Sequence, residues 1–390
     1  MKIRIAITGV GVVSSAGIGK EAFWNSLLNG VPKNGFLIED FDPLPFFDGN
    51  AKEARRADRF QQLALAAAKE AIDQAGDFVS DPTAVGTMIG TGVGGLGTLE
   101  DQVRVLLDKG PRRVSPFLVP MMMANAASAS VSMRYNLQGP CETIVTACAA
   151  GTHSIGRAAE LIRSGKVKAM IAGGAEATLT PIGTQGFVNM TAVSNEGISR
   201  PFDTQRDGFM QSEGAGVVIL EEWDHAISRG ADVLAELLGS GSTADAHHIT
   251  APAPGGNGAV RCMEMALNDA GLLPADIGQI NAHGTSTPLN DAAEAQAIAR
   301  VFGDLNPHVT GTKGVTGHSL GAAGALEAVA VVLSMLKETI PRTHGTTEID
   351  PEFGDLNLVY SDSIHWSPRP TISNSFGFGG HNGSIVIGPA

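Results

Sequence analysis

Short apolar runs and helical periodicities alternate along most of the chain. β-Branched and small apolar residues predict buried strands over 3–13, 85–89, 169–174, 214–220, 280–282 and 309–311, with closing strands near 356–360 and 384–387. Apolar residues recur at helical spacing over 60–75, 257–270 and 318–336. Continuous apolar strands separated by such helices are typical of sheets that helices cover on both faces. The pattern therefore predicts an α/β fold.

One strand-to-helix junction carries a cysteine. Ile144 and Val145 resemble the end of a buried strand, and residues 149–162 follow at helical spacing, so Cys148 lies where a helix begins. Unpaired amide N–H groups and the helix dipole favour negative charge there, which predicts a lowered thiol pKa and a nucleophilic thiolate. A small, buried, chemically inert side chain is the alternative interpretation of Cys148.

Two helix starts are similar to each other. Superposing residues 146–151 on 316–321 aligns the Thr and the Gly of both segments and places Cys148 on His318. A duplicated unit would explain the match. Because 390 residues exceed one ordinary core, we predict an N-terminal half, 1–237, and a C-terminal half, 238–390.

Composition narrows the class of protein. The net charge of −13 argues against nucleic-acid binding but allows a local basic patch. Three cysteines without regular spacing predict free thiols in a reducing compartment. The apolar runs are too short for a membrane span and glycines interrupt the N-terminal run, so we expect no membrane insertion and a cytoplasmic location.

Polar residues also stand among small ones at four places where packing alone would favour apolar side chains. These places are His283 with Thr285 and Thr287, Lys313 with His318, Glu327 in the following helix pattern, and the glycine-dense segment 374–383 with Phe376 and Phe378. A buried or capping role is the alternative for each histidine. A zinc site of Cys148, His283 and His318 would lack a closely spaced ligand pair. A cysteine–histidine protease would leave one histidine and Lys313 without a role.

Taken together, these stretches resemble the β-ketoacyl-[acyl carrier protein] synthases of the thiolase fold, and specifically the elongating kind with a Cys-His-His triad. The resemblance covers essentially the whole chain, and its motifs include 7–11, 90–97, 110–116, 146–148, 173–176, 199–203, 206–209, 214–216, 281–288, 316–318 and 374–380. It implies duplicated βαβαβαββ halves that form a five-layer αβαβα core. Initiating enzymes of the family carry asparagine at the second histidine, and chain-length partner subunits lack the cysteine. Cys148 and His318 therefore imply an active elongating enzyme.

The resemblance also implies a role for each candidate residue. Cys148 would take an acyl group from an acyl carrier protein, and His283 and His318 would stabilise the enolate that malonyl decarboxylation leaves. The backbone N–H groups of Cys148 and Phe378 would form the oxyanion hole, and Phe378 would gate the acyl channel. Lys313 and Glu327 would support the site. The phosphopantetheine arm is expected at Thr250, Thr285 and Thr287, and the acyl chain at Val93, Leu118 and Phe376, with residues near 118 supplied by a dimer partner.

No cofactor or catalytic metal is expected, because phosphopantetheine arrives on the carrier protein; a structural ion near Glu327 stays open. The expected partners are a second copy of the chain and the acidic carrier protein, which would dock on Arg55, Arg56, Arg112 and Arg113. For Arg55 and Arg56, a solvated helix face is the alternative.

The implied reaction is that of a 3-oxoacyl-[acyl carrier protein] synthase II-like enzyme, the decarboxylative Claisen condensation of malonyl carrier protein with a Cys-bound acyl chain in fatty acid elongation. A ketosynthase of a specialised lipid or polyketide pathway is the alternative. Two departures from the family pattern favour the specialised pathway. His381 stands where threonine is commoner in the family, and the segment 188–199 is shorter than in typical relatives.

Overall fold

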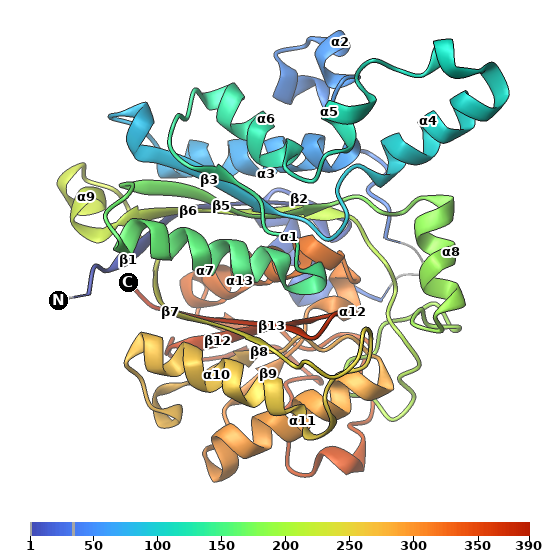
Figure 1. Ribbon diagram of the computed structural model, residues 1–390. Coiled ribbons are helices and arrows are strands. Elements are labelled where there is room, and N and C mark those ends of the chain that lie inside the picture. The colour runs from blue at the N-terminus through green and yellow to red at the C-terminus, as the bar shows by residue number, and fades with distance from the viewer. Residues whose placement is uncertain (1, 33–35) are drawn as a thin grey trace.

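The fold consists of five alternating layers of helices and sheets (Figure 1). The computed structural model describes residues 2–32 and 36–390. The first sheet contains β1 (Ile5–Ser14), β3 (Val85–Gly90), β4 (Cys141–Glu142), β5 (Ala169–Glu176) and β6 (Gly214–Glu222), and β2 (Gly17–Ile18) pairs with β1. The second sheet contains β7 (Ala235–Ala244), β8 (Gln279–Asn281), β9 (His308–Thr310), β12 (Thr371–Gly377) and β13 (His381–Gly388).

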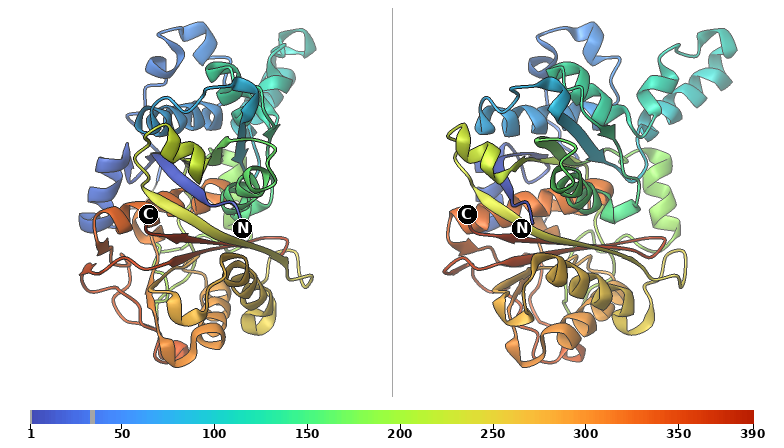
Figure 2. Two further views of the ribbon diagram at one scale, coloured as in Figure 1. Left: turned by 90° about the vertical axis from the view of Figure 1, so that its left-hand side faces the viewer. Right: turned by 60° about the vertical axis from the view of Figure 1, so that its left-hand side comes forward.

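Helices form the other three layers. The two sheets enclose α7 (Ala150–Arg163) and α13 (Ala323–Leu336), which contact strands of both sheets. On the outside, α3 (Arg59–Ala75) and α6 (Ala126–Tyr135) cover the first sheet, whereas α10 (Asn257–Ala270) covers the second and packs against α11 (Pro288–Phe302). This arrangement confirms the predicted αβαβα core. Figure 2 shows that both termini lie on the same side of the molecule.

The two sheets repeat one topology. Their strand orders are β1-β6-β5-β3-β4 and β7-β13-β12-β8-β9, with two antiparallel pairings followed by two parallel ones in each. In this correspondence α7 follows β4 as α13 follows β9, so Cys148 and His318 precede equivalent helices. The sheets join where β1 pairs briefly with β7, at Ala6–Glu236 and Ile7–Ala235.

Small residues bring the two central helices together. A Cβ atom at Gly151 would lie 2.9 Å from Ala325 N, and one at Gly324 would lie 2.0 Å from Thr152 Oγ1. Only glycine permits such an approach, since real Cβ atoms do not come this close to other heavy atoms. This close crossing of the helices accounts for the small residues of both segments and brings the two helix starts to one place.

Most predicted elements are present, but several boundaries are wrong. Ile144 and Val145 do not end a strand, and Val145 is half exposed. The helix predicted over 318–336 begins as the 3₁₀ turn η8 (Leu320–Ala322), which leaves His318 ahead of it. The predicted strand at 356–360 makes only a single bridge, between Val309 and Leu358. The glycine-dense segment 374–383 lies mostly in two strands, with its beginning in β12 and its end in β13.

The remaining elements lie around this core. They include α1 (Lys20–Asn29), α2 (Ala51–Ala54), α4 (Leu96–Lys109), α5 (Leu118–Met122), α8 (Pro181–Asn189), α9 (Trp223–Ser228), α12 (Lys313–Thr316) and the strand pair β10 (Thr339–Ile340) and β11 (Ile364–His365), with short 3₁₀ turns between elements. Among the described residues no helix is both long and apolar enough to cross a membrane. The predicted division at 237/238 falls within β7 and stays a prediction.

Candidate active site

Cys148 lies in a tight turn at the start of α7. The 3₁₀ turn η4 (Ala147–Ala149) comes first, and Ala147 has a φ of +49°, which is uncommon for a residue other than glycine. The end of β12 packs against this turn: a Cβ atom at Gly377 would lie 3.0 Å from both Cys148 N and Thr146 O. The backbone that follows Gly377 therefore passes close beside the sulfur, which is buried.

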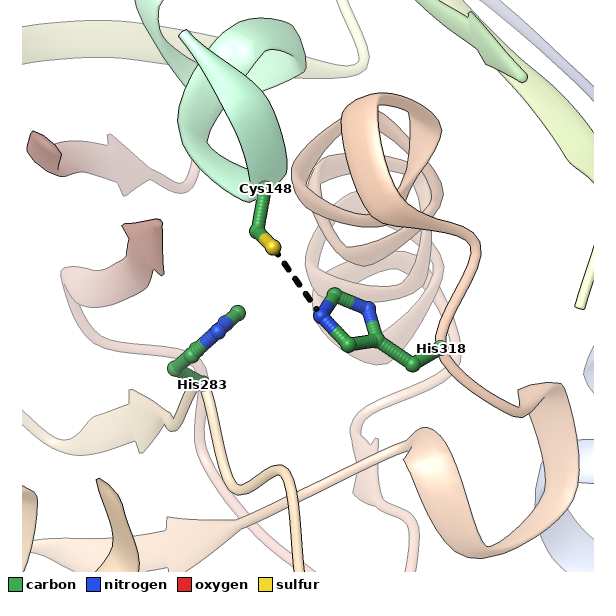
Figure 3. A group of neighbouring side chains, drawn as sticks. All are labelled: Cys148, His283 and His318. Atoms are coloured by element: carbon green, nitrogen blue, oxygen red, sulfur yellow. Dashed lines mark hydrogen bonds between the residues drawn. The ribbon is translucent and has the colours of Figure 1, made fainter. Parts of the chain in front are cut away.

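Two imidazoles face the cysteine (Figure 3). His318 Nε2 lies 3.2 Å from Cys148 Sγ, and the rings of His318 and His283 meet edge to face with centroids 5.3 Å apart. One ligating atom from each of the three side chains lies within 4.8 Å of the others. The structure thus brings together the three residues that the sequence predicts as a triad, from segments 135 and 170 residues away from Cys148.

Backbone contacts hold both histidines. The N–H groups of His283 and Gly284, just after β8, each donate to the Glu294 carboxylate of α11 at 2.8 Å. His318 N–H donates to Met210 O at 2.7 Å, in a bridge between the segments at 211 and 318. These contacts fix the backbone that carries both histidines before substrate arrives, and preorganisation of this kind makes such groups effective catalysts.

Lys313 and Glu327 form a buried ion pair beneath the histidines. Lys313 Nζ lies 2.5 Å from Glu327 Oε1 and donates to the His283 carbonyl oxygen, also at 2.5 Å. The ammonium also lies 3.4 Å from His283 Nδ1. Burial raises the pKa of Glu327 to about 7, and the Lys313 charge opposes that rise. The pair thus places a positive charge behind the imidazoles.

Burial controls the charge of the site. Burial raises the pKa of the Cys148 thiol to about 11. The Lys313 charge and the hydrogen bonds from the Phe378 and Cys148 amides lower this pKa but do not offset the effect of burial. The predicted lowering of the thiol pKa is therefore wrong, because desolvation exceeds the helix-terminus effect. Burial and the Lys313 charge hold the pKa values of His283 and His318 well below their usual value. At neutral pH a neutral thiol faces two neutral imidazoles.

This ionisation state predicts the pH dependence of cysteine reactivity. We expect alkylation of Cys148 by iodoacetamide to accelerate about tenfold per pH unit between about pH 7 and about pH 9, because only the thiolate reacts. Mass spectrometry of the Cys148 peptide measures the rate separately from that of the exposed Cys141. A rate that levels off below about pH 8 would show a thiol that ionises far more readily.

A cavity of about 340 Å³ opens onto these side chains. Among the predicted substrate-binding residues, Thr250, Thr285, Thr287 and Phe376 line it, together with Phe378. The hydroxyl oxygens of Thr285 and Thr287 lie 2.8 Å apart. Val93 and Leu118 do not line this cavity, and Val93 is 47% exposed. Their predicted contact with the acyl chain stays a prediction.

An aromatic row that the sequence patterns do not predict forms one wall of the site. Phe378 contacts Phe187 of α8 with ring centroids 6.4 Å apart, Phe187 meets Phe209 at 5.7 Å, and Phe209 meets the His318 ring at 4.8 Å. Phe209 stands in one of the motifs that carry the resemblance, but no local pattern points to Phe187. Asp245, which also lines the cavity and accepts a hydrogen bond from Asn382, was missed as well.

The four predicted docking arginines are exposed. Arg55 and Arg56 follow α2, and Arg112 and Arg113 lie in the 3₁₀ turn η3 (Pro111–Arg113). The Arg56 guanidinium lies over the Phe117 ring, 4.0 Å from its centroid, so α2 is next to the segment that follows η3. This contact places Arg56 beside Phe117, four residues after Arg113.

The three triad side chains could also ligate a metal ion, since cysteine and histidine are zinc ligands. The ammonium of Lys313 beside His283 disfavours a second cation there. The absence of a metal and of a cofactor stays a prediction, as does the ion near Glu327.

Comparisons with known proteins agree with this geometry. Residues 31–226 match the family model "Beta-ketoacyl synthase, N-terminal domain", and residues 234–347 match "Beta-ketoacyl synthase, C-terminal domain". A curated relative, the 3-oxoacyl-[acyl-carrier-protein] synthase 2 of Synechocystis sp., is 43% identical over 99% of this chain and 98% of its own length.

Solved structures are similar over the full chain. The ishigamide ketosynthase/chain length factor has a TM-score of 0.93 at 32% identity, with 100% of both chains covered. A type II polyketide synthase acyl-carrier protein in complex with its hexaketide-bound ketosynthase has a TM-score of 0.90 at 30% identity, again over 100% of both chains.

Proposed function

Because the chain belongs to the β-ketoacyl synthase family, we propose that it elongates acyl chains as a 3-oxoacyl-[acyl carrier protein] synthase II-like acyltransferase. The observation that carries the proposal is the buried Cys148 sulfur, which lies 3.2 Å from His318 Nε2 and faces His283 across a cavity open to substrate. Incubating the protein with an acyl carrier thioester and malonyl carrier protein tests it. We expect an acyl adduct on Cys148 and a product longer by two carbons; recovery of neither would contradict the proposal.

The first half-reaction moves the acyl group to the enzyme. Cys148 Sγ attacks the thioester carbonyl while His318 Nε2 takes the thiol proton, because both groups start neutral. The carbonyl oxygen gains negative charge, which the amides of Cys148 and Phe378 are proposed to stabilise; their hydrogen bonds to the Cys148 sulfur support this role. The C–S bond to the carrier then breaks, and the leaving thiolate takes the proton from His318.

The second half-reaction forms the new C–C bond. Malonyl carrier protein loses CO2, and the electron pair of the broken C–C bond becomes an enolate. The Nε2–H groups of His283 and His318 stabilise its oxygen, with the Lys313 charge behind them; for this step the neutral His318 ring carries its proton on Nε2, the other tautomer from the one that accepts the thiol proton. The enolate carbon attacks the acyl-Cys148 carbonyl, the C–S bond to Cys148 breaks, and the released thiolate takes a proton from solvent, which restores the neutral thiol.

Fatty acid elongation is the better supported pathway. Identity is 43% to the curated 3-oxoacyl-[acyl-carrier-protein] synthase 2 but 30–32% to the two polyketide-related structures, so the specialised alternative is not favoured. Condensation rates on a primary fatty acid carrier protein and on pathway-specific carriers, with primers of matched length, test this assignment. A strong preference for a specialised carrier would reverse it.

The carrier protein is proposed to dock on the exposed arginines that the sequence analysis selected. Support comes from the ketosynthase structure that holds its own acyl-carrier protein. We expect Arg112→Glu with Arg113→Glu to lower kcat/KM for the carrier substrate about tenfold, through KM and most strongly at low salt. Arg261→Glu with Arg300→Glu, an exposed pair on other elements, is the matched control. An equal loss of kcat/KM in the Arg112/Arg113 and Arg261/Arg300 double variants would contradict the proposed docking site.

A homodimer is also proposed. The edge strand β4 is exposed, and it leaves N–H and C=O groups of its free side without strand partners in the described chain. Exposed apolar side chains stand in the same half of the chain: Met133 of α6, which contacts β4, is 76% exposed, and Leu107 of α4 is 77% exposed. Burying such a patch against a second copy is favourable. A partner subunit would also cover Val93 and Leu118.

Light scattering tests the homodimer. We expect the wild-type chain to have twice the mass of 40.2 kDa, and Leu107→Glu with Met133→Glu to shift it toward the monomer. The equally exposed Leu273→Glu should stay dimeric. A monomeric wild-type protein would contradict the proposed homodimer.

A cytoplasmic location is also proposed, because all three cysteines are free thiols, which a reducing compartment maintains.

A further inference from the structure

The two oxyanion-hole amides belong to separate segments whose spacing the structure must hold. Cys148 N–H lies in η4, and Phe378 N–H follows β12, so no single turn fixes the distance between them. Ala147 of η4 holds a positive φ, a conformation that persists only where surrounding contacts impose it. Gly377 packs on η4, and Thr152 Oγ1 lies 2.8 Å from Ser375 Oγ of β12; a side chain that connects the turn itself to the hairpin would fix the spacing further.

His153 makes such a connection. It lies in the first turn of α7, and its Nδ1 is 2.8 Å from Thr146 Oγ1, two residues before the nucleophile. Its Nε2 is 3.0 Å from the carbonyl oxygen of Asn382 in β13. Asn382 pairs with Phe376 of β12, at the base of the loop that carries Phe378. One ring thus connects the turn that supplies the Cys148 amide to β13, the strand paired with β12, which the Phe378 amide follows.

The chemistry of the ring defines the direction of both hydrogen bonds. A carbonyl oxygen only accepts, so Nε2 carries the proton and donates to Asn382. Burial lowers the pKa of His153, so the ring is neutral and Nδ1 accepts from the Thr146 hydroxyl. The ring also packs on Gly383, where a Cβ atom would lie 3.0 Å from Nε2. Its position therefore depends on glycine there.

We propose that His153 is a positioning residue for acyl transfer, which clamps the nucleophile turn to β13 and thereby sets the spacing of the Cys148 and Phe378 amide donors. The inference rests on the proposed acyl transfer to Cys148. It concerns a residue that touches neither the sulfur nor the substrate cavity in the described contacts.

The test compares two reactions of the same sulfur in the full-length protein. Acylation by an acyl carrier thioester develops an oxyanion, whereas alkylation by iodoacetamide does not. His153→Phe keeps the ring and removes both hydrogen bonds. We expect it to slow acylation about 10- to 100-fold and alkylation several-fold less, because the oxyanion needs both donors in place, whereas the thiolate that is alkylated keeps the Lys313 charge. His153→Gln, which keeps a donor for Asn382, should recover part of the loss.

Two further variants keep the test decisive. Thr146→Val removes only the hydroxyl that donates to His153, and it replaces His153→Phe as the test if His153→Phe does not fold. Acylation of Thr146→Val at the wild-type rate would then overturn the proposal. His225→Phe, at a half-buried histidine beside the Phe78 carbonyl, is the matched control and should acylate normally. Unchanged acylation in folded His153→Phe, or equal losses of acylation and alkylation, would also overturn the proposal. A wild-type protein that is not acylated at all would instead refute the proposed function.

Discussion

Cys148→Ala is expected to abolish condensation, with a loss of at least about 1,000-fold, while malonyl decarboxylation stays measurable. The acyl group has no other thiol within reach, because Cys141 is exposed on β4 and Cys262 lies buried in α10, and neither lines the cavity. Decarboxylation needs donors for the enolate, and those come from His283 and His318. Product analysis by mass spectrometry and CO2 release from malonyl carrier protein measure the two steps separately.

Cys262→Ala provides the matched control, since it removes a second buried thiol outside the site. We expect this variant to condense at close to the wild-type rate. Condensation by Cys148→Ala at the wild-type rate would show that another group carries the acyl chain. Loss of decarboxylation together with condensation would show that the substitution disturbs the whole site.

The sequence allowed the fold and the triad to be predicted because each depends on local patterns or on short motifs. Buried strands with Ile and Val runs and the α3 periodicity are visible at once, and α3 ends within a residue or so of its prediction. Cys148 and His318 stand in comparable helix-start segments, so the duplication of the fold is partly visible at the site itself. Neither prediction needed knowledge of distant contacts.

The features that were missed depend on three-dimensional packing. The thiol pKa was predicted to fall because the helix terminus is a local feature, whereas the burial that raises it comes from residues of both halves. Phe187 joins the site only because α8 lies against the loop of Phe378. The His153 bridge likewise spans 229 residues between ring and carbonyl. No periodicity within the chain indicates contacts of this kind.

The two histidines are expected to be separable by the step that each supports. His283→Ala and His318→Ala should each slow malonyl decarboxylation about 100-fold, the usual cost of one preorganised donor to an oxyanion. Acylation should respond differently. His318 Nε2 contacts the sulfur at 3.2 Å, so its loss should also slow acylation about 100-fold or more, as expected for a general base. His283→Ala should acylate within about threefold of wild type, since it does not take the proton.

His318→Asn makes the distinction sharper. The side-chain amide can donate to the enolate but cannot accept the thiol proton as a base, so decarboxylation should exceed that of His318→Ala while acylation stays slow. Stopped-flow decarboxylation and mass-resolved acylation of Cys148 provide the two rates. Equal effects of His283→Ala and His318→Ala on both steps would mean that the 3.2 Å contact with Sγ has no role in proton transfer. The chemistry would then depend on the shared positive field of Lys313 rather than on one imidazole acting as base.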